Sequence, residues 1–441
     1  MKAHLSNAAY GVLDYAAYPI GMLLVAPIML RNLGVAQYGV WAIATAAVNA
    51  GSIIASGFGD ANIQHVATSR SSGDSTALRR AVRSTMGIHL VLGSVMAILS
   101  WVVAPYLAHH VAASSADLDF TCLWCIRIAG VITFARAVET VCISTQRAFE
   151  RYGAAVRISV IGRLLSLAAA AVLTFISHSV ISILAATAVI TVLALYFQLG
   201  RLKQLLHAET LLPAFDPEAT RALFRFGIFS WLMAVSGVIF SQADKLIGGA
   251  TLGAVAVASY ALCAQMAQPI YGLTASGLHF LFPYLSGRRV TASQTALRRS
   301  VIMALAANIA FVLLSTFGLL LVGNRILFAW GGEAIARSGS SLLPVLAWSS
   351  ALLALNVTGS YAMLALGRVL TITWLNLFAG ATMMVLIYEL LPRLGMSGIA
   401  DARVAYGLIT LLIYIPMAFL LRPNTKEAAK ITARVPLREE A

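Results

Sequence analysis

Apolar runs long enough to cross a lipid bilayer recur along the whole chain. A helix needs about 20 residues to cross the roughly 30 Å hydrocarbon core, where backbone polar groups must be satisfied within a helix or a closed barrel. With 60% hydrophobic and 11% charged residues, the chain has too little polar surface to cover a soluble globule. We expect an all-α polytopic membrane protein with twelve transmembrane helices, at about Tyr10–Leu30, Gly39–Phe58, Ser84–Leu107, Phe120–Thr145, Ile158–Ile176, Ile181–Leu199, Gly227–Gly248, Ala256–Leu285, Ser300–Gly323, Leu342–Leu366, Thr371–Leu391 and Ala402–Leu421.

Two copies of one unit make up the chain. The pentapeptide TALRR occurs at Thr76–Arg80 and, 219 positions later, at Thr295–Arg299. The Leu-Gly turns that begin at Leu33 and Leu252 repeat at the same spacing, without a gap. Both pentapeptides follow an even-numbered span, so the halves enter the membrane the same way up. We expect two parallel six-helix lobes that rock around a central cavity. A static scaffold is the alternative, but charges buried between lobes are costly to keep for structure alone.

The basic residues predict the topology. With the N-terminus inside, the inner segments hold 22 of the 31 Lys and Arg residues, whereas the outer loops hold only Arg31, Arg325, Arg337 and Arg393. The positive-inside rule then predicts that both termini are cytoplasmic. The net charge of +14 is therefore explained by topology, and no nucleic-acid partner is expected.

The longest polar stretch lies between the sixth and seventh spans and contains Pro213 and Pro217. Such a stretch is typical of a linker. We expect an N-terminal lobe over residues 1–200, a cytoplasmic inter-lobe linker over 201–226, a C-terminal lobe over 227–421 and a basic cytoplasmic tail over 422–441. The outer loops are short. The largest is expected near Asn324–Ser341, which is too small for a catalytic domain.

Ionisable residues inside the spans are the candidates for a site. A charge at the bilayer centre costs roughly 2.5 to 3.5 kcal/mol on insertion scales, so each should face a partner or water. Arginine offers a phosphate a fixed fork, whereas carboxylates can load and release protons. The candidates for substrate binding are Arg136, Glu139, Arg163, Asp244 and Lys245, and those for ion or proton coupling are Asp14 and Glu139.

Each candidate also has a structural interpretation. Arg136 and Glu139 lie three residues apart on one helix face, where they form either an internal ion pair or part of a cavity. Asp14 and Arg163 lie at similar depth in their helices and can pair. Arg127 lies on the opposite side of its helix from Arg136, nearer the outer surface, where its side chain can extend to the interface.

Asp244 and Lys245 are adjacent in the outer third of the seventh span. Neighbours on a helix point about 100° apart, so the two side chains pair poorly with each other. Each needs its own partner. Lys245 can either extend toward the outer surface or serve the interface between the lobes. Arg403 lies at the start of the twelfth span, and Asp60 lies just past the end of the second.

Several motifs that would indicate an enzyme or a metal site are incomplete. The chain lacks GxxxxGK[ST], so no ATP-driven step of its own is expected. Cys122 and Cys125 have CxxC spacing without a second pair, which is typical of small packing residues. Asp117 and Asp119 spell DxD in a loop of about a dozen residues, without the domain that a glycosyltransferase requires. We expect no cofactor, no metal and no catalytic residue.

Four segments resemble one family. The opening AYGVLDYAAYPIGMLLVAPIMLRNLGVAQYGVWAIATA is similar to the first two helices of the polysaccharide-transporter branch of the multidrug/oligosaccharidyl-lipid/polysaccharide exporter superfamily. The turn after helix four of that family resembles TQRAFERYGAAVRIS at 145–159. Its helices seven to eight resemble QADKLIGGATLGAVAVASYALCAQMAQPI at 242–270, and the end of its helix eight resembles FPYLS at 282–286. The resemblance implies two parallel six-helix lobes of the MATE type.

The resemblance also implies a function. It indicates a Wzx-like flippase, not an enzyme, that carries polyprenyl-diphosphate-linked oligosaccharide units across the bacterial inner membrane for O-antigen or exopolysaccharide assembly. The implied partners are an undecaprenyl-diphosphate-linked glycan and membrane lipid, with a polysaccharide polymerase and a chain-length regulator. Arg136, Lys245 and Arg163 are the cations that such a cavity would use.

Two alternatives remain. A cation-coupled exporter of drugs or metabolites predicts a mainly acidic cavity. A membrane-embedded polysaccharide polymerase or ligase predicts one long outer loop with catalytic residues, which this chain lacks.

Overall fold

The computed structural model describes residues 21–71, 73–112, 115–149, 152–207, 211–279, 281–282, 284–286 and 294–420. The regular structure in these ranges is helical. It comprises Gly21–Leu33 and then α2 (Val35–Ser56), α3 (Gly59–Ser71), α4 (Ser75–Val111), α5 (Ala116–Ala148), α6 (Tyr152–Ile176), α7 (Val180–Leu206), α8 (Pro217–Gly277), α10 (Gln294–Ala365), α11 (Val369–Leu394), α12 (Met396–Thr410), the short 3-10 helix η1 (Leu411–Ile413) and α13 (Tyr414–Leu420).

Two helices are each broken once by a glycine. α8 turns at Gly253, with φ 81°, and α10 turns at Gly332, with φ 74°, a backbone region that glycine enters without steric cost. Nine stretches of the described chain are long and apolar enough to cross a membrane, and Gly21–Leu33 is a shorter one. When both sides of each break are counted, the helices account for the twelve expected spans.

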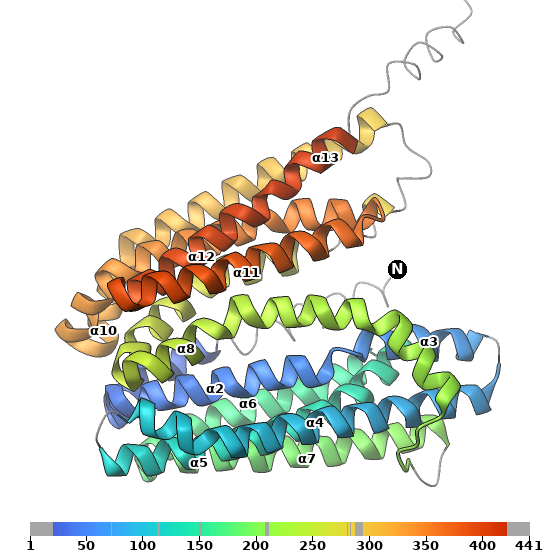
Figure 1. The fold of residues 1–441 in the computed structure, drawn as a ribbon, viewed down its shortest axis with the longest axis horizontal. Helices are drawn as coiled ribbons and strands as arrows, with labels where there is room; N and C mark the ends of the chain where they lie inside the picture. The colour runs from blue at the N-terminus through green and yellow to red at the C-terminus, as the bar shows by residue number, and fades with distance from the viewer. Residues whose placement is uncertain are drawn as a thin grey trace, which may run out of the picture.

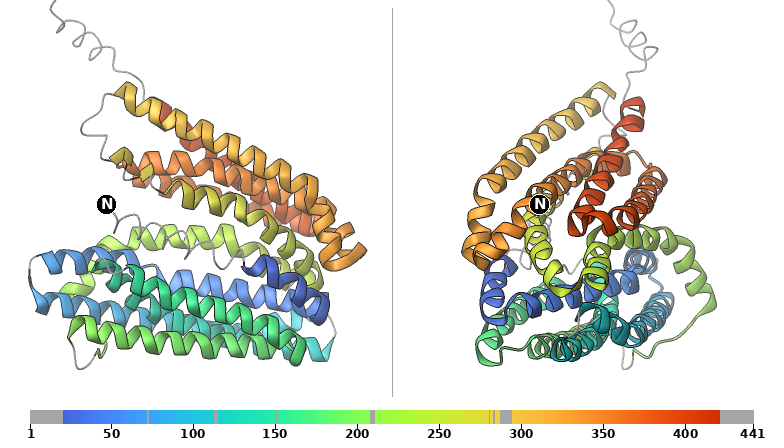
Figure 2. Two further views of the ribbon diagram at one scale, coloured as in Figure 1. Left: turned by 180° about the vertical axis from the view of Figure 1, so that it is seen from behind. Right: turned by 60° about the vertical axis from the view of Figure 1, so that its left-hand side comes forward.

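The helices form two bundles that meet at one end of the molecule and diverge toward the other (Figures 1 and 2). One bundle contains α2 to α7 and the other α10 to α13, while α8 lies along the boundary. The joined end contains the turns at Gly34, Gly253, Gly332 and Gly395. The divergent end contains the starts of α4 and α10. An all-α fold of two parallel lobes is therefore confirmed.

The apolar core follows the same division. At the joined end one continuous core includes residues of both bundles, such as Tyr38, Val257 and Ile399. Toward the divergent end it separates into one cluster around Val82 and Val141 in the first bundle and another around Met363 and Ile372 in the second. Apolar burial thus joins α10 to α13 to the first bundle at one end only, while a further cluster around Phe58, Ile88 and Leu223 packs the start of α8 on the first bundle.

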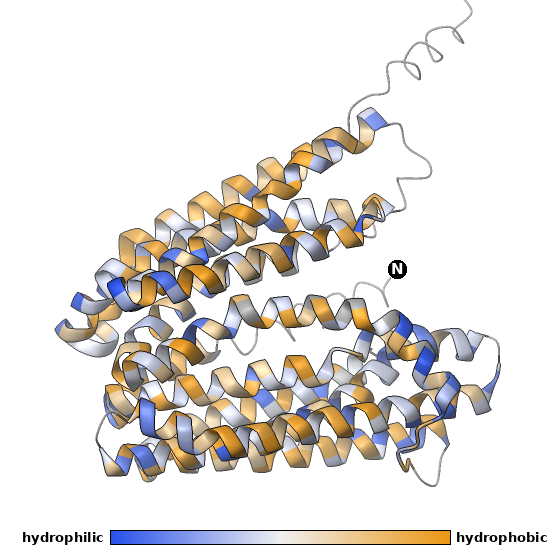
Figure 3. Ribbon diagram, viewed as in Figure 1, coloured by the Kyte–Doolittle hydropathy of each residue, from blue (hydrophilic) through white to orange (hydrophobic). Residues whose placement is uncertain are grey.

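The outward faces of the helices are apolar. Hydrophobic residues run along the helices, and hydrophilic ones gather near helix ends, most plainly around α3 and the start of α8 (Figure 3). Large apolar side chains such as Leu321, at 78% exposure, and Val102, at 70%, point away from the core. Such a surface is suited to lipid.

The internal repeat is visible in the structure. Each TALRR segment lies in the first turns of a long helix, α4 or α10. Both helices start at the divergent end and run to the joined end, where α10 turns back at Gly332 (Figure 1). Gly34 and Gly253 have nearly identical backbone angles, φ 82° and ψ 167° against φ 81° and ψ 175°. His89 Nδ1 lies 2.9 Å from Ala137 O, and Asn308, 219 positions later, donates to Ala354 O at 3.0 Å.

α8 connects the two bundles along its length. Near its start, Trp231 Nε1 donates to Ile54 O at 2.9 Å in the first bundle. Farther along, Phe240 O accepts from Arg403 Nη1 of α12 at 3.1 Å. The preceding segment lies on α4, where Arg83 Nε donates to Leu212 O at 2.7 Å. The division of the chain at residues 200, 226 and 421 stays a prediction.

One boundary expectation is wrong. The largest outer loop, expected at Asn324–Ser341, is helical except for the break at Gly332. Both adjoining helices continue past the ends of their apolar runs, because a helix does not have to end where the hydrocarbon ends. The expected linker over 201–226 is likewise helical at both ends, since α7 continues to Leu206 and α8 begins at Pro217.

Candidate functional site

A buried ionic cluster joins α8 to α12. Arg403 Nη1 forms a short ion pair with Asp244 Oδ2, and Tyr260 OH donates to the same oxygen at 2.7 Å. The other carboxylate oxygen accepts from Lys245 N at 2.8 Å. The Arg403 guanidinium also lies 4.3 Å from the centre of the Phe240 ring. The Asp244 side chain has no exposed surface and the Arg403 side chain is 9% exposed, so their charges are balanced within the protein.

The sequence allows this close approach because a glycine faces α12. A Cβ placed on Gly248 would lie 2.9 Å from Met396 Sδ and 3.2 Å from Ile399 Cδ1. With only a hydrogen there, α8 and α12 come close enough for Arg403 to reach across to Asp244, one turn before Gly248. Asp244 was expected to need a partner, and that partner is Arg403, which lies 159 positions away in the sequence.

Lys245 gives the cluster an excess positive charge. Asp244 and Arg403 neutralise each other, while Lys245 follows one position later and points to another side of α8. Its side chain is half-buried, and its ammonium forms no hydrogen bond or ion pair with any residue that the structure describes. The arrangement can therefore accept an anionic group beside a neutral ion pair.

The candidates in the first bundle lie on two adjacent helices. Glu139 of α5 accepts from Ser159 Oγ of α6 at 3.1 Å. Arg136 lies one turn before Glu139, and Arg163 one turn after Ser159, so these side chains share the α5–α6 boundary. Asp14 lies outside the described residues. The roles of all these residues, and those of Asp244 and Lys245, stay predictions.

The two bundles are linked by polar contacts at the joined end. Arg31 donates to the carbonyl oxygens of Ala329 and, at 3.3 Å, Trp330, which end a helix just before the break at Gly332. Tyr38 OH donates to Gln265 Oε1 at 3.0 Å. A cation at a helix C-terminus is favourable because the last carbonyls carry partial negative charge. Opening this end requires these bonds to break.

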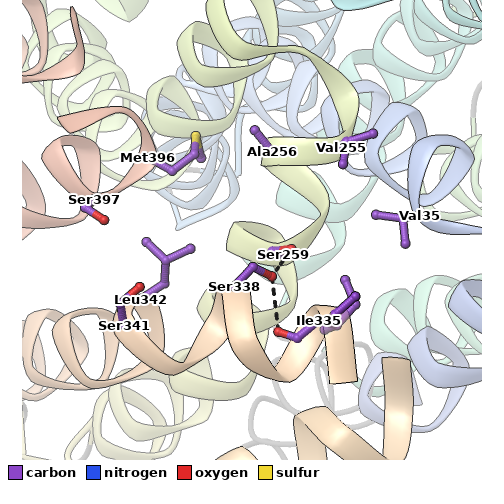
Figure 4. A pocket seen from close by; sticks show the side chains of 11 residues that line it. Val35, Val255, Ala256, Ser259, Ile335, Ser338, Ser341, Leu342, Met396 and Ser397 are labelled. Carbon is purple, nitrogen blue, oxygen red and sulfur yellow. Dashed lines mark hydrogen bonds between the residues drawn. The ribbon is translucent and has the colours of Figure 1, made fainter. Parts of the chain in front are cut away.

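A pocket of about 450 Å³ also lies at the joined end, between α2, α8, α10 and α12 (Figure 4). Four hydroxyl groups line it, from Ser259, Ser338, Ser341 and Ser397, and its other lining residues are apolar. Ser259 Oγ and Ser338 Oγ lie 2.9 Å apart. The lining carries no charged side chain, so the pocket suits an uncharged group.

Metal-binding residues do not cluster in the parts of the chain that the structure describes. Across these ranges no three His, Cys, Asp or Glu side chains come together in a way that could hold an ion. The four cysteines are buried and unpaired. Asp117 and Asp119, expected in a loop, lie instead in the first turn of α5.

Two parallel bundles joined at one end form a fold that this chain shares with solved membrane transporters. The chain resembles the lipid II flippase MurJ in an inward closed conformation, at 14% identity and TM-score 0.76, covering 93% of this chain and 87% of that one. It also resembles an inward-facing multidrug resistance MATE transporter, at 13% identity and TM-score 0.72, covering 93% and 98%. An outward-facing MATE transporter gives 14% identity and TM-score 0.58, covering 96% and 97%.

The chain belongs to the polysaccharide biosynthesis protein family, whose model matches residues 7–287. No curated protein matches it. The resemblance noted in the sequence is thereby confirmed, as is a multi-pass membrane protein with a transporter fold. The identities to the solved structures are low, so those structures establish the fold alone.

Proposed function

We propose that this protein is a flippase that moves polyprenyl-diphosphate-linked oligosaccharide repeat units from the cytoplasmic to the periplasmic leaflet by alternating access. The observation that carries the proposal is the divided core, continuous at the joined end and separate at the divergent end. Two bundles held on one side only can exchange which side is closed. Membership of a polysaccharide biosynthesis family supports the glycan cargo.

The proposed orientation places the divergent end in the cytoplasm. Both TALRR segments lie at that end, and basic loops favour the cytoplasmic side. Both termini are then cytoplasmic, and the membrane is the bacterial inner membrane. The higher TM-score to the inward-facing MATE transporter, 0.72 against 0.58 for the outward-facing one, supports an arrangement open to the cytoplasm.

The diphosphate of the cargo is the proposed partner of the intramembrane cations. Lys245 supplies a charge that the Asp244–Arg403 pair does not neutralise, and Arg136 and Arg163 are the candidate cations of the first bundle. The glycan is expected between the bundles and the polyprenyl tail in lipid. Asp14 and Glu139 are the carboxylates proposed to couple transport to an ion or proton. A polysaccharide polymerase and a chain-length regulator are the proposed protein partners in O-antigen or exopolysaccharide assembly.

The test is leaflet transfer in proteoliposomes. The full chain is reconstituted with a fluorescent polyprenyl-diphosphate-linked oligosaccharide, and a membrane-impermeant reductant bleaches the outer leaflet. We expect protein-dependent transfer, which Lys245→Gln slows by about tenfold, the effect of removing a charged hydrogen-bond donor. Lys203→Gln, at an exposed position near the end of α7, is the control and should transfer normally. Equal transfer in protein-free vesicles contradicts the proposal.

A cation-coupled multidrug or metabolite exporter is the second candidate, favoured by the likeness to MATE transporters. Such a protein requires a carboxylate that a cation can reach. Here the Asp244 carboxylate already binds Arg403 and Tyr260, so an exporter would have to use Asp14 or Glu139 instead. Gradient-dependent drug efflux from cells that make normal surface polysaccharide would support the exporter instead.

A further inference from the structure

Arg127 lies outside the site described above, on the face of the first bundle that α4 and α5 form. Its guanidinium carbon is 5.0 Å from the centre of the Trp101 ring of α4 and 5.3 Å from that of Trp124, one turn earlier on α5. The arginine is thus flanked by two aromatic faces, which attract a cation. Both rings are exposed, Trp101 by 46% and Trp124 by 37%, so this group borders lipid.

The guanidinium keeps unused donors. Arg127 Nε is buried and has no hydrogen-bond partner, and in the described parts of the chain Arg127 forms no ion pair. The acidic residues of α5 nearest in sequence, Asp117 and Asp119, lie in its first turn, two or more turns away, and neither binds it. The outer nitrogens of the guanidinium are not buried in this way and form no hydrogen bond in the described structure, so their N–H groups can reach an acceptor from outside the protein.

The local packing fixes this arrangement. A Cβ on Gly130, one turn after Arg127, would lie 3.1 Å from both Ala97 O and Ser100 Cβ. The glycine therefore lets α5 pack closely on α4, which places Trp101 beside Arg127. The indole rings are held by the two helices and not by a loop, so the guanidinium is presented at a defined position.

The backbone of Arg127 lies about 7 Å inside the edge of the hydrocarbon of one leaflet. α5 has 33 residues and is about 50 Å long, so it exceeds the roughly 30 Å hydrocarbon core by about 10 Å at each end. Arg127 lies 11 residues into α5, or about 17 Å, and helix side chains tilt toward the N-terminus. The side chain can therefore reach the phosphate level. Tyr106 and Phe120, 61% and 57% exposed, add to an aromatic belt.

We infer that Arg127, Trp101 and Trp124 form a binding site for the phosphate of an anionic phospholipid in the leaflet at the joined end. The guanidinium would donate to phosphate oxygens as a fork, while the indole rings contact the glycerol and upper acyl chain. The site belongs to α4 and α5, which lie in the bundle opposite α10 to α13 (Figure 1), and does not depend on the proposed transport cargo.

Quenching of tryptophan fluorescence by brominated lipid tests this site on the full chain in detergent micelles. We expect brominated phosphatidylglycerol to quench at lower concentration than brominated phosphatidylcholine. Arg127→Gln should raise the half-quenching concentration of phosphatidylglycerol about fivefold, the effect of one arginine near an anionic surface. Arg127→Lys should keep part of the preference because it keeps the charge.

Arg393→Gln is the matched control, because Arg393 is 76% exposed near the joined end of α11 and has no aromatic pair in the described structure. It should quench as the wild type does. If Arg127→Gln fails to fold, the comparison of the two lipids on the wild-type protein still tests whether the anionic lipid is preferred. Equal quenching by both lipids, or equal effects of Arg127→Gln and Arg393→Gln, overturns the inference.

Discussion

The Asp244 carboxylate accepts from Arg403, from Tyr260 and from a backbone N–H, at a position with no exposed surface. Removing one charge of such a pair leaves the other buried without compensation, whereas removing both does not. The contributions of Asp244 and Arg403 to the free energy of unfolding should therefore depend on each other.

Double substitution measures that dependence. We expect Arg403→Gln alone to lower the free energy of unfolding by about 3 to 5 kcal/mol, and Asp244→Asn combined with Arg403→Gln to lower it by less. The measurement is unfolding by SDS titration in mixed micelles. Arg337→Gln is the control, because its 2.7 Å pair with Glu333 is largely exposed and its loss should not be measurable. Additive losses in the double variant contradict the expected coupling.

The sequence identified Asp244 and Lys245 as charges that need partners, but it did not identify Arg403 as the partner. Asp244 and Arg403 are 159 positions apart, and the pairing depends on how α8 and α12 cross at Gly248. The sequence did contain one indication, because Arg403 is a third charge at the start of another apolar span. Which of several such charges meet is decided by the packing of the bundles, and a single sequence does not contain that information.

The two Leu-Gly turns are the elements in which sequence and structure agree most closely. Gly34 and Gly253 share a backbone region with positive φ and ψ near 180° that is essentially restricted to glycine. The spans, the repeat and its parallel sense follow from hydropathy and from the spacing of these turns. The helix ends do not follow from hydropathy, because hydropathy marks where the lipid ends, whereas the hydrogen bonding of a helix can continue beyond that point. Residues 324–341, which are helical except at Gly332, are an example.

Alanine substitution tests the equivalence of the two turns. Gly34→Ala and Gly253→Ala should each destabilise the protein by about 1 to 3 kcal/mol, by similar amounts, since each forces a Cβ into the same strained conformation. Gly318→Ala is the control, because no other part of the protein lies within 4 Å of its added Cβ; it should leave stability unchanged or raise it. Thermal unfolding in detergent compares the three. A large effect at only one turn contradicts the structural equivalence.

For the molecule as a whole, alternating access requires that the contacts of the joined end can be broken. Tyr38→Phe removes the 3.0 Å bond to Gln265 and should favour opening of that end by about fivefold, since one hydrogen bond contributes about 1 kcal/mol. The readout is the distance between spin labels at Val35 and Glu333, at the joined end. Tyr106→Phe, an exposed tyrosine, is the control. An unchanged distance distribution in Tyr38→Phe means that this bond does not hold the end closed.

The most direct measurement combines that pair with a second one at the divergent end, at Ser75 and Gln294, both exposed, in a chain whose four cysteines are replaced. Double electron–electron resonance is recorded in lipid with and without the lipid-linked oligosaccharide. Alternating access predicts two populations in which a longer distance at the joined end accompanies a shorter one at the divergent end. Distances that stay fixed at both ends in every condition, or that lengthen together, would contradict a transporter built from two rocking lobes.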